Sequence, residues 1–187
     1  MMQDDYLISM FHVPLLHLQV RNWNIKKLQL MEILNGVELK IADGDEVHTD
    51  FHHQFKNNWD RSRIDQLKHL FEEEFEAFCN HFSFSSYQIK GSWFEVAKKH
   101  DYHPAHNHHP LGYVAVCYVQ YDENIHKPVY FISPFTNFTS GATLYHHPKN
   151  VKEGSILFFP ASIIHETRPN KSDLERIVVT FNIDTQF

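Results

Sequence analysis

Apolar residues recur with two different periods along the chain, and the period changes near residue 86. Before this point the apolar steps are three and four residues, as on one face of a helix. After it, short runs rich in β-branched and aromatic residues follow one another, separated by turn-forming segments. The pattern predicts a single domain over residues 1–187, with helix-rich support over 1–86 and a β-rich core over 87–187.

One helix is predicted after Asn22 or Asn24, either of which can cap its N-terminus. Asn35-Gly36 provides the stop signal at its C-terminal end. The predicted apolar face of this helix carries Ile25, Leu28, Met31 and Leu34.

The segments on either side of this helix are less regular. Residues 11–16 are apolar but contain Pro14, which favours an edge strand. Residues 36–58 are polar and are expected to be irregular. They carry three histidines, which fit either a second metal cluster or, more simply, a solvated loop: His48, His52 and His53.

The clearest helical pattern runs from Asp60, a good N-cap, to Phe82. Its apolar stripe is Ile64, Leu67, Phe71, Phe75, Phe78 and Phe82. The acidic run 72–74 falls mostly on the outer face. We interpret the stripe as core packing and not as a cofactor site.

The C-terminal part contains several strand-like runs with no helical pattern between them, which favours a sandwich or barrel. The predicted strands are Tyr87–Val96, Tyr113–Tyr121, Val129–Ile132, Ala142–Tyr145, Ser155–Phe159 and Ile177–Ile183.

Composition narrows the class of protein. With 42% hydrophobic and 21% charged residues the chain is globular. Its net charge of −6 argues against a nucleic-acid partner, because a protein that binds nucleic acid needs a basic face. The N-terminus is acidic without a signal-peptide pattern, and no apolar run reaches the roughly 20 residues of a membrane span. Cys79 and Cys117 show no metal spacing and suit a reducing compartment. We therefore expect a cytoplasmic protein with no membrane partner; its oligomeric state is not readable.

Four of the 16 histidines fall within residues 103–109. On an extended segment, His106 and His108 lie on one face because strand side chains alternate. Two such nitrogens plus a third donor make a transition-metal site, and we propose His165 as the third. His103 and His109 are expected to be loop or substrate-side residues. The alternative is a histidine-rich surface loop.

Arg176 opens the last predicted strand, eleven residues after His165. If the two strands pair, Arg176 lies beside His165, one layer deeper in a barrel. Arg176, Val178, Thr180 and Asn182 then share a face by alternation. A buried arginine needs an anionic partner. The alternative is a rim salt bridge to Glu166, Asp173 or Glu175.

Five segments together resemble a known family: SWFEVAKK at 92–99, HNH at 106–108, AVCYVQY at 115–121, GSILFFPASIIH at 154–165 and ERIVVTFN at 175–182. They are similar to the 2-oxoglutarate/Fe(II)-dependent oxygenases of marine bacteria and their phages, relatives of the prolyl 4-hydroxylases. The resemblance covers about residues 85–187. It implies a double-stranded β-helix core, a jelly-roll or cupin-like fold, with an N-terminal helical layer.

The resemblance also implies roles for individual residues. His106, His108 and His165 correspond to the ligands of Fe(II), although His108 stands where most relatives carry Asp or Glu. Arg176 and Tyr118 correspond to the residues that hold the far carboxylate of 2-oxoglutarate. Some relatives carry a serine at the position of Val178. Thr180 is a candidate to supply that hydroxyl, and Asn182 is included as a candidate cosubstrate contact.

The implied reaction uses O₂ to convert 2-oxoglutarate to succinate and CO₂ while a substrate is hydroxylated. The expected substrate is an amino-acid or peptidyl side chain, or another small molecule. Phe135, Phe138 and Tyr145 either form an aromatic lid or pack in a surface loop.

Two alternatives remain. A cupin shares the barrel and the His-x-His pair, but its motif expects a glutamate near Gly112 and has no need of Arg176. A non-catalytic interaction module on the same fold would have no reason to keep the three histidines and Arg176 together.

Overall fold

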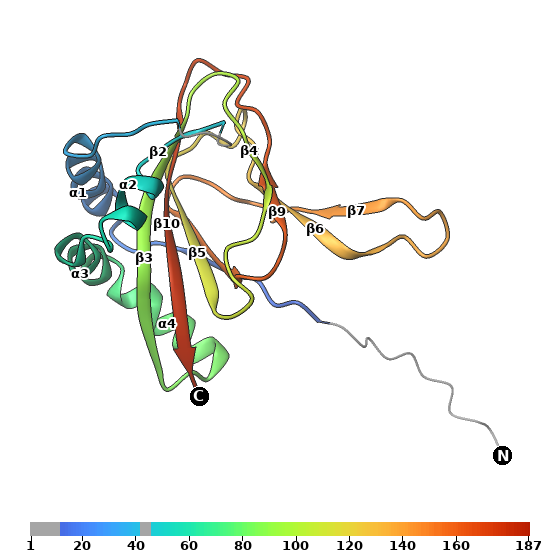
Figure 1. The fold of residues 1–187 in the computed structure, drawn as a ribbon, viewed down its shortest axis with the longest axis horizontal. Helices are drawn as coiled ribbons and strands as arrows, with labels where there is room; N and C mark the ends of the chain where they lie inside the picture. The colour runs from blue at the N-terminus through green and yellow to red at the C-terminus, as the bar shows by residue number, and fades with distance from the viewer. Residues whose placement is uncertain (1–11, 42–45) are drawn as a thin grey trace.

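The computed structural model describes residues 12–41 and 46–187. The acidic N-terminus and Phe11, about which the sequence raises expectations, lie outside these residues. The described chain forms two antiparallel sheets and four helices (Figure 1).

The larger sheet has six strands in the order β1-β8-β5-β10-β3-β2, and every neighbouring pair is antiparallel. In chain order these are β1 (Leu16–Gln19), β2 (His48–Thr49), β3 (Ser86–Ala97), β5 (Tyr113–Gln120), β8 (Ser155–Pro160) and β10 (Arg176–Gln186). The predicted N-terminal edge strand is confirmed in kind, but β1 begins two residues after Pro14 because proline cannot donate to the ladder.

The smaller sheet has four strands in the order β4-β9-β6-β7. They are β4 (His103–His106), β6 (Val129–Thr136), β7 (Thr143–His146) and β9 (His165–Thr167). Together the two sheets form the double-stranded β-helix that the family resemblance implies. All six predicted strands exist, within a few residues of their expected bounds, except that β6 and β10 extend further.

The helices gather on one side of the larger sheet (Figure 1). They are α1 (Trp23–Asn35), α2 (Phe51–Lys56), α3 (Arg61–Leu70) and α4 (Glu72–Phe82). The expected helical layer is therefore present. The expectation of an irregular segment over 36–58 is wrong in part, because β2 and α2 form there.

The facing of α1 differs from the predicted one. Leu30 and Leu34 are its buried residues, whereas Ile25 and Leu28 are exposed. Apolar residues lie all around this short helix, so its sequence allows more than one face to be buried. Packing against β5 and the core buries the face that carries Leu30.

The long predicted helix is two helices, which is a correction. Asp60 caps α3 as expected, accepting a hydrogen bond from the amide of Arg63, and the chain leaves helical geometry at Phe71. The rings of Phe71 and Phe75, on either side of this break, both pack against Phe181 of β10. The break is invisible in the apolar period because the spacing continues across it.

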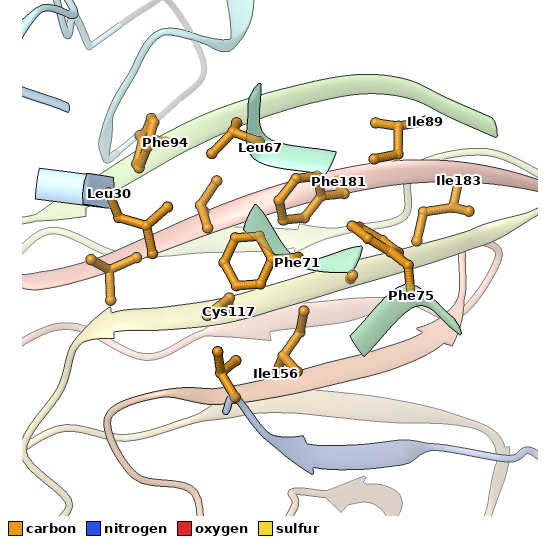
Figure 2. Packing of buried hydrophobic residues seen from close by; sticks show 14 of the residues in the cluster. Leu30, Leu67, Phe71, Phe75, Ile89, Phe94, Cys117, Ile156, Phe181 and Ile183 are labelled. Atoms are coloured by element: carbon orange, nitrogen blue, oxygen red, sulfur yellow. The ribbon is translucent and has the colours of Figure 1, made fainter. Parts of the chain in front are cut away.

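Alternation along β10 separates two hydrophobic clusters. Ile177, Val179, Phe181 and Ile183 face the helices and join the main core, whose packing Figure 2 shows. Val178 faces the other way, into the space between the sheets, with Tyr118 and Phe159. The phenylalanine stripe of α3 and α4 is core, as predicted.

The hairpin formed by β6 and β7 extends away from the rest of the molecule (Figure 1). Phe138 at its end is 92% exposed. Phe135, Phe138 and Tyr145 are not among the described residues that line the two cavities beside His106 and His165, so the aromatic lid stays a prediction.

Candidate active site

Three histidine side chains converge between the two sheets. His106 ends β4, His108 follows two residues later, and His165 begins β9. Their potential ligand nitrogens all lie within 4.8 Å of one another, with the Nε2 atoms of His108 and His165 3.2 Å apart. Across residues 12–41 and 46–187 this is the one group of three or more potential metal ligands. Among the described residues, His48, His52 and His53 do not join in a second such group.

Strand pairing brings these histidines together. His106 lies directly opposite His165 in the pairing of β4 with β9. The extended segment ends at His106, earlier than the His-x-His argument assumes. His108 is held instead by its backbone amide, which donates to the carbonyl oxygen of Ala161 at 3.0 Å.

Each ring is held through its Nδ1 atom. That nitrogen lies 2.7 Å from the Pro104 carbonyl oxygen in His106, and 2.9 Å from the Ile163 carbonyl oxygen in His165. In His108 it lies 2.9 Å from the side-chain oxygen of Asn182. Since these oxygens only accept, Nδ1 carries the proton in each ring and Nε2 presents a lone pair.

The environment keeps all three imidazoles neutral near neutral pH. Burial, with the neighbouring histidines adding to it, lowers the pKa of His165 to about 3. Burial and the charge of His103 lower the pKa of His106 to about 4, and burial also lowers the pKa of His108. Lone pairs that face one another repel unless a cation lies between them. Three neutral imidazoles with converging lone pairs therefore fit a transition-metal ion such as Fe(II).

A cavity next to the histidines leads to Arg176. The guanidinium is buried, and Nη1 donates to the carbonyl oxygens of Lys127 at 3.2 Å and Arg168 at 3.4 Å. Among the described residues no carboxylate forms an ion pair with it. The predicted rim salt bridge is absent among the described residues. Glu166 pairs with Arg168 and Asp173 pairs with Lys99, and Glu175 forms no ion pair with Arg176. Glu95 lines the same cavity and acts on the guanidinium electrostatically without forming an ion pair with it. A buried cation that no carboxylate pairs with is suited to bind an anion.

The route by which Arg176 reaches this cavity differs from the predicted one. β9 pairs with β4 and β6, and β10 pairs with β3 and β5, so His165 and Arg176 lie in opposite sheets. They are not neighbours across a hairpin. From β8 through β9 to β10 the chain crosses from the larger sheet to the smaller one and back, and the two side chains face each other across the cavity that both line.

Comparison with known proteins assigns the chain to a family. Residues 91–182 match the model of a family described as "Putative 2OG-Fe(II) oxygenase". The chain belongs to the 2OG-Fe(II) oxygenases. As such it uses Fe(II), 2-oxoglutarate and O₂. No curated protein matches the sequence.

Solved structures share the fold at low identity. The viral collagen prolyl hydroxylase of Paramecium bursaria Chlorella virus-1 has a TM-score of 0.57 at 12% identity, covering 92% of this chain and 96% of that one. HygX from Streptomyces hygroscopicus has a TM-score of 0.57 at 10% identity, covering 94% and 84%. A Pseudomonas putida prolyl-4-hydroxylase has a TM-score of 0.52 at 11% identity, covering 92% and 93%. No helix in the described part of the oxygenase is both long and apolar enough to cross a membrane.

Tyr118 lies in the same cavity of the oxygenase as Arg176. Its hydroxyl oxygen accepts a hydrogen bond from the amide of Val129 at 3.0 Å, and burial raises its pKa to about 12. The phenol is therefore neutral at physiological pH and keeps its own proton to donate.

Besides Arg176, the inward face of β10 carries Val178, Thr180 and Asn182, which do not all lie in the same part of the site. Val178 and Thr180 line the cavity of Arg176, and the Thr180 side chain is buried. Asn182 lies further along, with its amide oxygen on His108. The expected contact between Asn182 and the cosubstrate stays a prediction.

Sequence reasoning missed Glu95 as a residue of the oxygenase site, whereas His103, expected as a loop or substrate-side residue, lies there too. Glu95 on β3 and His103 on β4 line both cavities, and the ring of His103 stacks on that of His106 at 4.0 Å between centroids. Trp93 stacks on His108 at 5.5 Å. The signal was present in SWFEVAKK, where alternation puts Trp93, Glu95 and Ala97 on one face. His109 lies outside this set and is exposed.

Proposed function

We propose that this oxygenase hydroxylates an amino-acid or peptidyl side chain, converting 2-oxoglutarate to succinate and CO₂. The observation that carries the proposal is the pairing of two features in one cavity: three neutral imidazoles with converging lone pairs, and the buried Arg176 with no carboxylate partner in the described chain. The first suits Fe(II), and the second suits the far carboxylate of 2-oxoglutarate.

In this proposal His106, His108 and His165 hold the metal on one side. Their Nδ1 contacts fix the ring orientations before metal binds, so little rearrangement is required. Bound Fe(II), with 2-oxoglutarate and O₂, supplies the oxidation that inserts one oxygen atom into a substrate C–H bond and leaves succinate and CO₂.

Arg176 binds the distal carboxylate of 2-oxoglutarate, and Tyr118 donates its phenolic proton to the same group. The guanidinium can form two parallel hydrogen bonds with a carboxylate. Thr180, on the same face of β10, offers a hydroxyl along the cosubstrate. The apolar wall that includes Val178 and Val129 excludes water from this ion pair.

The inward Arg176 also separates this proposal from a cupin. A cupin that does not use 2-oxoglutarate has no anion to place against a buried guanidinium, and Gly112 stands near the position of its expected glutamate. A cytoplasmic location and a single oxygenase domain over 1–187 stay predictions.

The test compares binding of the two groups. Arg176→Ala is expected to weaken 2-oxoglutarate binding by about 100-fold or more, because charge-assisted hydrogen bonds are lost. Its affinity for Mn(II), a stand-in for Fe(II), should change by less than about twofold, since Arg176 contacts no ligand histidine. Calorimetry of the Mn(II)-loaded protein with 2-oxoglutarate measures the first quantity, and Mn(II) titration the second.

Arg61→Ala, which removes an exposed arginine on α3, is the matched control and should change neither quantity. His106→Ala and His165→Ala should abolish Mn(II) binding. Equal losses of both affinities in Arg176→Ala would contradict its assignment, and wild-type protein with no affinity for 2-oxoglutarate would leave the cupin-like alternative.

A further inference from the structure

Glu95 places a negative charge at the wall of a second cavity, which His106 and His108 also line, and it lines the cavity of Arg176 as well. It lies on the inner face of β3, and only 11% of its side chain is exposed. A carboxylate withdrawn from water is costly unless cationic or hydrogen-bonding partners surround it. The partners of Glu95 therefore indicate what the cavity is suited to bind.

The partners that the chain itself supplies are few. Oε1 accepts a hydrogen bond from the indole Nε1 of Trp93 at 2.9 Å, and Oε2 lies 3.4 Å from Nδ1 of His103. Among the described residues, no lysine or arginine forms an ion pair with Glu95. Two carboxylate oxygens offer about four acceptor positions, so part of this capacity stays directed at the cavity.

The cavity has a volume of about 220 Å³. This is smaller than the roughly 300–1,000 Å³ typical of drug-sized ligands and suits one side chain. Phe51 and Trp93 form its aromatic wall, and His106 and His108 reach it from the histidine cluster. Among the described residues that line it, Glu95 is the one carboxylate, and none is lysine or arginine.

We propose that Glu95 binds a cationic group of the substrate, an ammonium or a guanidinium, so that the substrate is a lysine or arginine side chain, free or within a peptide. The cation replaces the water that the buried carboxylate has lost, and the aromatic wall adds cation–π attraction. Because the histidine cluster lines the same cavity, a carbon of that side chain then faces the metal site. This inference rests on the proposed function and specifies its substrate class.

The experiment measures binding to the protein loaded with Mn(II) and 2-oxoglutarate. Two cationic probes, N-acetyl-lysine amide and N-acetyl-arginine amide, are compared with their uncharged counterparts, N-acetyl-norleucine amide and N-acetyl-citrulline amide. Wild-type protein is expected to bind at least one cationic probe about tenfold or more tightly than its counterpart. Succinate release with Fe(II) should show the same preference.

Glu95→Gln keeps the shape and removes the charge. It is expected to abolish the preference for the cationic probe while the Kd values of Mn(II) and 2-oxoglutarate stay within about twofold of wild type. Glu95→Asp, which keeps the charge, should retain part of the preference and serves if Glu95→Gln does not fold. Glu123→Gln, an exposed position after β5, is the matched control and should behave as wild type.

Three results would overturn the inference: equal affinity for charged and uncharged probes, a preference that survives in Glu95→Gln, or a loss of Mn(II) or 2-oxoglutarate affinity in Glu95→Gln as large as the loss of probe affinity. The last would assign Glu95 to the metal and cosubstrate. Each leaves the proposed function standing as long as wild-type protein binds 2-oxoglutarate. Failure of that binding would remove the proposed function itself.

Discussion

His108 differs from the other two histidines of the cluster in what holds its ring. His106 and His165 are held by backbone carbonyl oxygens, whereas His108 is held by a side chain, that of Asn182. The family resemblance also places His108 where most relatives carry a carboxylate. A neutral imidazole in that place needs a fixed tautomer to act as a ligand, and the Asn182 oxygen selects it.

Asn182→Ala is therefore expected to weaken Mn(II) binding by about tenfold or more, the usual cost of losing a partner behind a ligand. Metal titration of the folded variant measures this effect. Asn80→Ala, at an exposed position of α4, should bind Mn(II) as wild type does. An unchanged affinity in Asn182→Ala would mean that His108 keeps its orientation without this contact or is not a ligand.

At the scale of elements, a buried ion pair attaches α2 to β3. Asp50, which precedes α2, accepts a hydrogen bond from the amide of Phe94 at 2.8 Å and pairs with Arg63 of α3. Arg63 also donates to the Ser92 carbonyl oxygen of β3. Phe51 opens α2, so this pair also positions the aromatic wall that Phe51 and Trp93 form in the second cavity, the one lined by Glu95.

Breaking the pair leaves one buried charge without compensation. Asp50→Ala is expected to lower the free energy of unfolding by about 3–5 kcal/mol. Urea unfolding monitored by circular dichroism measures it. Lys99→Ala breaks the exposed pair with Asp173 and should cost at most about 1 kcal/mol. A loss of similar size in both variants would show that burial adds nothing to the Asp50–Arg63 pair.

At the scale of the whole molecule, burying three histidines makes the metal-free protein sensitive to acid. In the folded protein the pKa of His165 is about 3 and that of His106 about 4. The pKa of a histidine in the unfolded chain is about 6.5. Between these values the unfolded chain binds more protons than the folded chain. This contribution to stability is therefore complete above the unfolded pKa and is lost as the pH falls.

We expect the free energy of unfolding of chelator-treated protein to decrease as the pH is lowered from about 7 to about 5. Urea unfolding at each pH measures this dependence. His165→Gln removes one titrating group and should flatten the profile over the same range. A stability that is constant or increases on acidification would contradict the burial of neutral imidazoles.

The chain by itself determined the inward face of the last strand. Alternation from Arg176 through Thr180 to Asn182 follows from the period of a strand and needs no tertiary information. The same holds for the phenylalanine stripe of α3 and α4, whose period is compatible with burial on one side only. The three histidines were identified by their type and by the family motifs around them, because imidazole is a ligand in any fold.

The tertiary structure decided what lies opposite these residues. His165 and Arg176 meet across two sheets and not within a hairpin, the helix breaks at Phe71, and α1 turns Leu30 inward. Glu95 could be assigned a role only once Trp93, His103 and the cavity surrounded it. Such contacts join residues far apart in sequence, and local periodicity carries no information about which distant side chain completes a pair.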